Sequence, residues 1–222
     1  MRVVGPEGWE STARLQEAVK DLPGEKVLYY GTKDRVDGLE QLRRFQGAGL
    51  GVPVFTESVL DATELEMNGV SMWGRRRVHS HGVDIQGFGT RPSGLPRRRW
   101  ALSEFWVQAI PARREFRQHV FNGRCIRVGE KVQTRPQVRK LPVRSRGNGW
   151  TLQYPPNPPA PPGIRDVAKQ ALAAVGYLFG AVDILEGQDG RLYVLEVNSA
   201  PSLRDNQTLA VYVKEIKRWN SQ

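Results

Sequence analysis

Residues 180–203 read Gly-Ala-Val-Asp-Ile-Leu-Glu-Gly-Gln-Asp-Gly-Arg-Leu-Tyr-Val-Leu-Glu-Val-Asn-Ser-Ala-Pro-Ser-Leu. Residues 181–185 and 191–197 have the composition of two strands. The pair Asp189-Gly190 between them is a strong hairpin signal, because both residues tolerate the backbone angles of a tight turn. We therefore expect the two strands to lie side by side.

The polar residues of this hairpin predict a cation site. Asp183 lies on the first strand, and Glu196 lies on the second with Asn198 two residues further on. Residues two apart share one face of a strand, so two carboxylates and one amide oxygen can converge there. Such oxygen ligands suit Mg²⁺. The alternative is a solvated hairpin with ordinary polar side chains, and the pattern alone leaves both interpretations open.

Composition limits the class of protein. The 222 residues suffice for one large domain or two small ones. Hydrophobic residues make up 39% of the chain, which argues against extensive disorder. Cys125 is the only cysteine, which excludes an internal disulfide and a cysteine zinc cluster. No segment has the length of a signal-peptide core or reaches the roughly 18 to 20 apolar residues of a membrane span. We expect a soluble, cytoplasmic protein.

The net charge of +10 predicts an anionic partner: a nucleotide, a nucleic acid or an acidic small molecule. Solvated faces are the ordinary explanation of basic runs. A basic nucleic-acid-binding protein without catalytic chemistry is nevertheless an open alternative, because aromatic side chains near the basic runs could stack on bases. The basic runs are 75–77, 97–99, 113–114 and 135–146, and the aromatic residues are Trp100, Phe105, Trp106 and Trp150.

Apolar periodicity and turn residues predict the remaining elements. Asn122-Gly123 indicates a second hairpin. The proline-rich segment 155–162 predicts an extended connector in preference to an SH3-type ligand. Helices are expected over 11–21, 38–48, 164–179 and 208–219, and strands over 26–30, 69–77, 116–121, 123–132 and 150–154.

A basic strand followed by small residues indicates a phosphate cradle. Arg75 and Arg77 share one face of the expected strand, and Ser80 and Gly82 follow in a short loop. Guanidinium forks and backbone N–H groups both match phosphate oxygens. His79 and His81 in that loop are a weaker metal candidate, because no third ligand accompanies them.

Together these segments resemble, in order, those of the ATP-grasp ligases. Within that family the likeness is to the RimK-like branch and to short phage-type carboxylate–amine ligases, over roughly residues 35–210. Arg75 precedes Gly82 by seven residues, the family spacing between a phosphate-binding cation and its flap. The other segments are Leu50-Gly51-Val52-Pro53-Val54, Trp106-Val107-Gln108-Ala109-Ile110, Arg114-Glu115-Phe116-Arg117-Gln118-His119-Val120-Phe121, Gly180-Ala181-Val182-Asp183-Ile184 and Leu195-Glu196-Val197-Asn198-Ser199-Ala200-Pro201.

The resemblance implies an α+β ATP-grasp fold, with ATP held between the antiparallel sheets of two lobes. Residues 1–33 would form a shortened lead-in, 34–105 the small lobe with the phosphate flap, and 106–222 the large lobe with the metal site. Two departures from the family stand out. Asp37-Gly38 occupies a position where the family often has a phosphate-binding Lys, so that contact is either missing or supplied by Lys33. The flap cation is Arg75 instead of Lys, which favours a forked contact over a point charge.

The resemblance also implies an ADP-forming carbon–nitrogen ligase that joins a carboxylate to an amine through an acyl phosphate. ATP and one or two Mg²⁺ ions would be required, with Mn²⁺ as a possible substitute. A protein that only binds nucleotide, or a ligase acting on an acceptor carried by a nucleic acid, are the other interpretations. The implied metal ligands are Asp183, Glu196 and Asn198; the implied ATP-binding residues are Arg75, Ser80, Gly82, Trp106, Val107, Gln108 and Lys131; the implied catalytic residues are Arg117 and Lys131.

Overall fold

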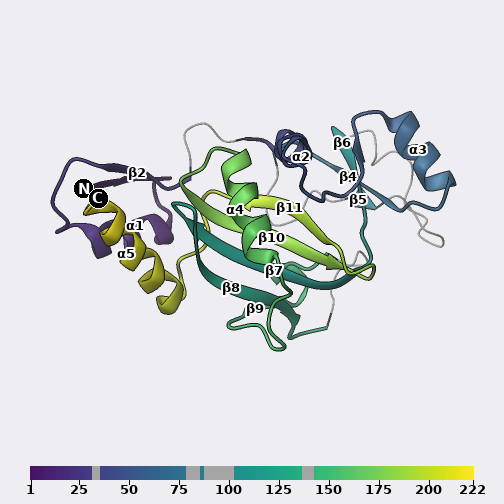
Figure 1. Cartoon of the computed structure of the whole chain (residues 1–222). Coiled ribbons are helices and arrows are strands. Elements are labelled where there is room, and N and C mark those ends of the chain that lie inside the picture. The colour runs from purple at the N-terminus through teal and green to yellow at the C-terminus, as the bar shows by residue number, and fades with distance from the viewer. Residues whose placement is uncertain (32–35, 79–85, 88–102, 137–142) are drawn as a thin grey trace.

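The computed structural model describes residues 1–31, 36–78, 86–87, 103–136 and 143–222. Its centre is a five-stranded antiparallel sheet with the order β11-β10-β7-β8-β9 (Figure 1). A short 3-10 turn over Arg146–Asn148 precedes β9. The strands are β7 (Ala112–Phe121), β8 (Arg124–Gln133), β9 (Trp150–Gln153), β10 (Phe179–Gly187) and β11 (Leu192–Asn198).

Both predicted hairpins are confirmed. Asn122 and Gly123, between β7 and β8, have φ of 45° and 70°. A two-residue turn with positive φ at both positions matches the right-handed twist of the flanking strands, which explains the Asn-Gly sequence. In the second hairpin, between β10 and β11, Asp189 Oδ1 accepts a hydrogen bond from the backbone N–H of Arg191 at 3.1 Å.

One face of the central sheet is apolar and is covered by helices α4 (Ile164–Ala174) and α2 (Gly38–Gly47). Figure 1 shows α4 lying across β10 and β7, with α2 beside the β11 edge. The apolar side chains of α4 recur at the helical spacing, so they form one stripe against the sheet. The main buried contributors are Leu39, Leu42 and Phe45 of α2, Ile164, Ala168, Ala171 and Leu172 of α4, and Phe116, Val120, Val182 and Ile184 of the sheet.

Helix α4 is shorter than its periodicity predicts. The expected helix reached residue 179, but α4 ends at Ala174 and β10 already begins at Phe179. Gly176 has φ of 74°, the left-handed conformation that commonly terminates helices. The apolar residues after it continue the pattern as part of the connection and the strand, and not as helix.

A second, four-stranded sheet has the order β3-β6-β4-β5. Helix α3 (Val59–Met67), which the periodicity did not predict, packs on it through Ala62. Ser58 Oγ caps this helix by accepting a hydrogen bond from Asp61 N at 3.2 Å. The strands are β3 (Phe55–Thr56), β4 (Met72–Arg75), β5 (Gln86–Gly87) and β6 (Phe105–Gln108).

The two ends of the chain pack together. Strands β1 (Arg2–Val4) and β2 (Val27–Tyr29) are parallel neighbours, and α1 (Glu10–Val19) contacts α5 (Asn206–Asn220). In Figure 1 both termini lie at the end of the molecule opposite α3. These elements share one hydrophobic cluster, which also includes Phe121 and Phe179 of the central sheet. The residue boundaries expected for the lead-in and the two lobes stay a prediction.

The proline-rich segment joins β9 to α4 as an anchored connector. Its peptide bonds Tyr154-Pro155 and Asn157-Pro158 are cis. Arg114 of β7 donates to the carbonyl oxygens of Pro158 and Pro159, the latter at 3.0 Å.

Among the described helices, none combines the length and the apolar character that crossing a membrane requires.

Candidate functional site

The second face of the central sheet is polar. Glu115, Arg117 and His119 occupy alternate positions of β7, so their side chains share one face of the strand. Phe116 and Val120, at the intervening positions, pack in the core beneath α4. The polar face is therefore the one directed away from α4.

Asp183 lies at the centre of this face. Its Cα partner is Glu196 on β11 and, on the opposite side, Arg117 on β7. The predicted pairing of the two strands, with Asp183 beside Glu196, is confirmed. The sequence did not predict the second relationship, in which Arg117 faces the same aspartate.

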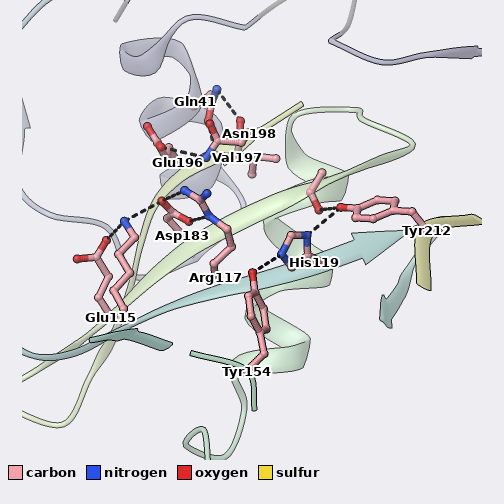
Figure 2. Close-up of polar contacts among 12 residues, drawn as sticks. Gln41, Glu115, Arg117, His119, Tyr154, Asp183, Glu196, Val197, Asn198 and Tyr212 are labelled. Carbon is pink, nitrogen blue, oxygen red and sulfur yellow. Dashed lines mark hydrogen bonds and ion pairs between the residues drawn. The ribbon is translucent and has the colours of Figure 1, made fainter. Parts of the chain in front are cut away.

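Asp183 is bound by two cations. Arg117 donates from Nε to Oδ1 at 2.7 Å and from Nη2 to Oδ2 at 2.8 Å, and Lys131 donates from Nζ to Oδ2 at 3.1 Å. Lys131 also donates to Glu115 Oε1. In Figure 2, Asp183 lies between Glu115 and Arg117 along this row of polar contacts. We call Glu115, Lys131, Asp183 and Arg117 the charged quartet.

The two carboxylates of the quartet are buried and its two cations are partly exposed, and the opposite charges determine the protonation of the four groups. Burial acts to raise the pKa of Asp183, but the charges of Arg117 and Lys131 outweigh it and hold that pKa below its usual value. Burial acts to lower the pKa of Lys131, but Asp183 and Glu115 outweigh it and raise the pKa to about 12. The pKa of Glu115 is raised, chiefly by burial. At neutral pH the lysine and arginine are therefore fully charged.

The strand that carries Glu196 and Asn198 is held along its outer edge. Gln41 of α2 accepts a hydrogen bond from Val197 N at 2.8 Å and donates to Val197 O at 3.4 Å (Figure 2). Asn198 Nδ2 donates to Glu196 Oε1 at 3.0 Å. Gln41 thus satisfies the backbone of Val197 as a neighbouring strand would, and it holds β11 at the residue between Glu196 and Asn198.

The donor set at this position fits a hard divalent cation. Asp183 and Glu196 offer carboxylate oxygens from paired positions, and Asn198 adds an amide oxygen. Within the described ranges, no group of three or more His, Cys, Asp and Glu residues is arranged to hold a metal ion. The set predicted here contains two carboxylates and an amide, a composition that suits Mg²⁺ with substrate phosphates as further ligands.

A neutral hydrogen-bonded chain adjoins the quartet. His119 Nε2 lies 2.9 Å from Tyr154 Oη, and Nδ1 lies 3.1 Å from Tyr212 Oη. Tyr212 donates to Gly180 O at 3.3 Å, so its oxygen accepts from His119 Nδ1–H, and Tyr154 donates to Nε2. Burial lowers the pKa of His119 to about 3, which keeps the imidazole neutral.

Tyr154 lies flat on β8 beside Arg117. A Cβ atom at Gly129, the Cα partner of Arg117, would stand 2.5 Å from the Tyr154 ring. The guanidinium of Arg127 stacks on this ring, 3.9 Å from its centroid. Tyr154 was not predicted as a site residue, because nothing in the local sequence around it indicates a contact with His119 of β7.

The predicted nucleotide residues are described only in part. Arg75 lies at the end of β4, and Ser80 and Gly82 fall outside the described residues, as do His79 and His81. Trp106 and Val107 are buried on β6, where each has Cα partners on both β3 and β4. Gln108 Oε1 accepts a hydrogen bond from Val54 N at 3.3 Å.

The departure at Asp37-Gly38 has a structural explanation. Asp37 caps α2 by accepting a hydrogen bond from Glu40 N at 2.9 Å, and it forms an ion pair with Arg77 at 3.5 Å. A helix-capping aspartate therefore stands where the family often has a lysine. Lys33, the alternative source of that contact, lies outside the described residues.

Part of the basic surface considered for nucleic acid is paired within the protein. Arg113 forms an ion pair with Glu186 and Arg114 with Glu130, at 3.1 Å and 2.6 Å. The run 97–99 and residues 137–142 fall outside the described ranges. No structural observation favours the nucleic-acid alternative over an internal role for these two arginines.

Comparison with known proteins gives matches only to structures. No protein-family model and no curated protein matches the chain. The ATP-grasp ligase PsnB, in complex with a minimal precursor, Mg and ADP, is similar with a TM-score of 0.66 and 15% identity, covering 96% of this chain and 66% of its own. In the complex with the minimal precursor alone, the chain spans 64% of PsnB.

Two further structures match over more of their own length. The D-cycloserine synthetase DcsG has a TM-score of 0.67 at 14% identity, and the alignment covers 99% of this chain and 98% of DcsG. The macrocyclase MdnC from Microcystis aeruginosa MRC, bound to precursor peptide MdnA, has a TM-score of 0.59 at 13% identity, covering 98% and 78%. These TM-scores establish the architecture and confirm the predicted fold class, and at identities this low they show the fold alone. The chain has the ATP-grasp fold.

Proposed function

We propose that this chain is an ATP- and Mg²⁺-dependent carboxylate–amine ligase that forms an amide through an acyl phosphate. The observation that carries the proposal is the binding of Asp183 by both Arg117 and Lys131, with Glu196 paired to it across β10 and β11. Cations and oxygen ligands thus meet at one point of an ATP-grasp fold. Similar structures support it, because PsnB is an ATP-grasp ligase complexed with Mg and ADP and DcsG is a D-cycloserine synthetase.

Asp183, Glu196 and Asn198 would hold the divalent ion. When bound, one or two Mg²⁺ ions supply charge neutralisation to the phosphate oxygens of ATP, and Mn²⁺ would serve in their place. The flap residues Arg75, Ser80 and Gly82 would contact the phosphates. Trp106, Val107 and Gln108 would line the adenine site.

Arg117 and Lys131 would act on the reacting groups. Phosphoryl transfer requires alignment and charge neutralisation more than covalent participation of the protein. The substrate carboxylate attacks the γ-phosphorus, and ADP leaves. The amine nitrogen then attacks the acyl carbon and inorganic phosphate leaves, so an amide forms. Lys131 would bind phosphate oxygens in the first step, and Arg117 would stabilise the oxyanion of the second.

The similar structures suggest which acceptors to test first. PsnB and MdnC were each bound to a precursor peptide, and DcsG makes a small molecule. We propose peptides with carboxylate side chains and free amino acids as the first substrate classes. The basic surface is compatible with an acidic acceptor.

The test is a screen for ADP release over amino acids, acidic peptides and amines, with mass spectrometry to detect an amide product. The screen compares the wild type with Asp183→Asn, and with Asp189→Asn as a carboxylate control in the turn of the same hairpin. We expect turnover in the wild type and in the control, and none in Asp183→Asn. Nucleotide binding without turnover across the panel would indicate a protein that only binds ATP, and would contradict the ligase assignment.

A further inference from the structure

Glu115 is a buried carboxylate to which the proposed function gives no role. It lies on β7 two residues before Arg117, and its side chain is 8% exposed. Its contact with Lys131 Nζ is 2.5 Å, shorter than the 3.1 Å that separates the same nitrogen from Asp183. One ammonium group is therefore shared unequally between two carboxylates (Figure 2).

This sharing matters because, besides Arg117, Asp183 binds the Lys131 ammonium and is also proposed to bind a divalent ion. A divalent ion bound by the Asp183 carboxylate would compete with the Lys131 ammonium for that carboxylate. A buried charge interacts strongly with its neighbours, since little water screens it. The position of Lys131 between Glu115 and Asp183 therefore affects how readily Asp183 accepts a metal.

We propose that Glu115 is a positioning residue: it draws Lys131 away from Asp183, and so keeps Asp183 available to a divalent ion and Lys131 available to phosphate. This inference rests on the proposed role of Asp183 as a metal ligand. Glu115 would not contact the substrate in this role. It would act only by positioning the Lys131 ammonium.

The inference predicts effects of opposite sign. In Glu115→Gln the amide oxygen still accepts a hydrogen bond from Lys131, but the competing charge is gone, so Lys131 binds Asp183 more tightly and metal affinity falls. In Lys131→Met one of the two cations that bind Asp183 is removed, while Arg117 stays, and metal affinity rises. A Glu115 that served only to balance charge in the folded protein would alter stability and leave the metal affinity of the folded protein unchanged.

A direct effect of the Glu115 charge on the metal is a further explanation, and a double-mutant cycle separates it. If Glu115 acts through Lys131, then Glu115→Gln has little effect in the Lys131→Met background. If it acts through its field on the ion, the effect is the same in both backgrounds. Residues of one ionic network commonly couple by about tenfold in affinity.

The experiment measures Mn²⁺ affinity by electron paramagnetic resonance, with and without a non-hydrolysable ATP analogue, at a temperature where circular dichroism shows each variant folded. We expect affinity about tenfold weaker in Glu115→Gln, about tenfold stronger in Lys131→Met, and a non-additive double variant. Glu130→Gln is the matched control, because Glu130 lies next to Lys131 on β8 but pairs with Arg114. Its Mn²⁺ affinity should equal that of the wild type.

Two different failures remain distinguishable. An additive cycle, or equal affinity in Glu115→Gln and the wild type, overturns the role of Glu115 while Asp183→Asn still abolishes Mn²⁺ binding. If Asp183→Asn binds Mn²⁺ like the wild type, or if no variant binds it under either condition, the proposed metal site itself is wrong.

Discussion

Arg117 and Asp183 face each other on β7 and β10, and the guanidinium donates through Nε and Nη2 to both carboxylate oxygens, at 2.7 and 2.8 Å. A fork of this kind requires the planar guanidinium, because an ammonium group offers only a point charge. The side chain of Arg117 is 21% exposed and that of Asp183 is 3% exposed. The arginine therefore connects a buried carboxylate to the open side of the sheet.

Replacing Arg117 by lysine should separate charge from geometry. We expect Arg117→Lys to lower kcat for amide formation by about 10²- to 10³-fold, the loss typical when one group that stabilises an oxyanion is removed. Arg113→Lys is the control, since Arg113 lies on the same strand with a side chain that is 66% exposed. Steady-state ADP release measures both. A loss of less than twofold in Arg117→Lys would contradict the assigned role.

Gly129→Ala should displace Tyr154. The added Cβ would stand 2.5 Å from the ring, far inside contact distance, so the ring has to move from its place beside His119. We expect the free energy of unfolding to fall by about 1 to 3 kcal/mol, as for other overpacked sites. Urea denaturation measures the change.

A double-mutant cycle and a second glycine test the cause. In a Tyr154→Ala background, Gly129→Ala should cost much less, because the ring that it meets is gone. Gly147→Ala should leave stability nearly unchanged, since nothing lies within 4 Å of a Cβ atom at that position. Equal costs of Gly129→Ala in both backgrounds would show that the clash with Tyr154 is not the reason.

The buried imidazole of His119 should make the protein sensitive to acid. Its folded pKa of about 3 lies below the ordinary value of 6.5, so between these values the unfolded chain binds more protons. The free energy of unfolding should therefore fall with pH below 6.5, by about 3 kcal/mol at pH 4 from this group alone. The charges that act on the imidazole are Arg117 and Arg127, which lower its pKa, and Asp183 and Asp205, which raise it.

Other acidic groups also titrate in this range, so the measurement is a difference. Urea denaturation of the wild type and of His119→Gln at pH 7, 5 and 4 removes their common contribution. We expect the stability difference between the two proteins to shrink or reverse as the pH falls. A difference that stays constant with pH would show that His119 does not titrate as its burial requires.

Gln41→Leu should loosen the outer edge of β11. The substitution leaves the buried N–H of Val197 without the acceptor that Gln41 Oε1 provides at 2.8 Å. We expect a loss of about 1 to 3 kcal/mol in the free energy of unfolding, the cost of an unsatisfied buried donor. Gln46→Leu, at an exposed position of the same helix, should change stability by less than about 0.5 kcal/mol. Similar effects of the two substitutions in urea denaturation would exclude the edge contact as the cause.

The sequence predicted the features that short-range residue patterns determine, namely the turns and the pairing of the strands that flank them. Asp189-Gly190 and Asn122-Gly123 indicated both hairpins of the central sheet, and strand pairing then placed Asp183 beside Glu196. Helix α3 was not predicted, because its residues Leu60 and Met67 are 78% and 84% exposed and so break the usual link between apolar character and burial. The Ser58 cap was the signal that could have indicated it.

Contacts between distant segments were beyond reach of the sequence. His119 forms hydrogen bonds with Tyr154, 35 positions along the chain, and with Tyr212, 93 positions along it. No local sequence pattern indicates such partners. The sequence could have indicated that Glu115 and Arg117 share one face of a strand, because they are two residues apart. The pairing of Glu115 with Lys131 requires the register of β7 and β8, which depends on the turn at Asn122-Gly123 and on an irregularity between His119 and Val120 that shifts the register.

The proposed function requires Asp183 to lie at the centre of a metal and nucleotide site. Isothermal titration of ATP into the wild type, Asp183→Asn and Asp189→Asn, each with and without Mg²⁺, measures this requirement. We expect Mg²⁺-dependent ATP binding in the wild type and in Asp189→Asn, and none in Asp183→Asn. Equal ATP affinity in Asp183→Asn and the wild type, or binding that does not depend on Mg²⁺, would contradict it.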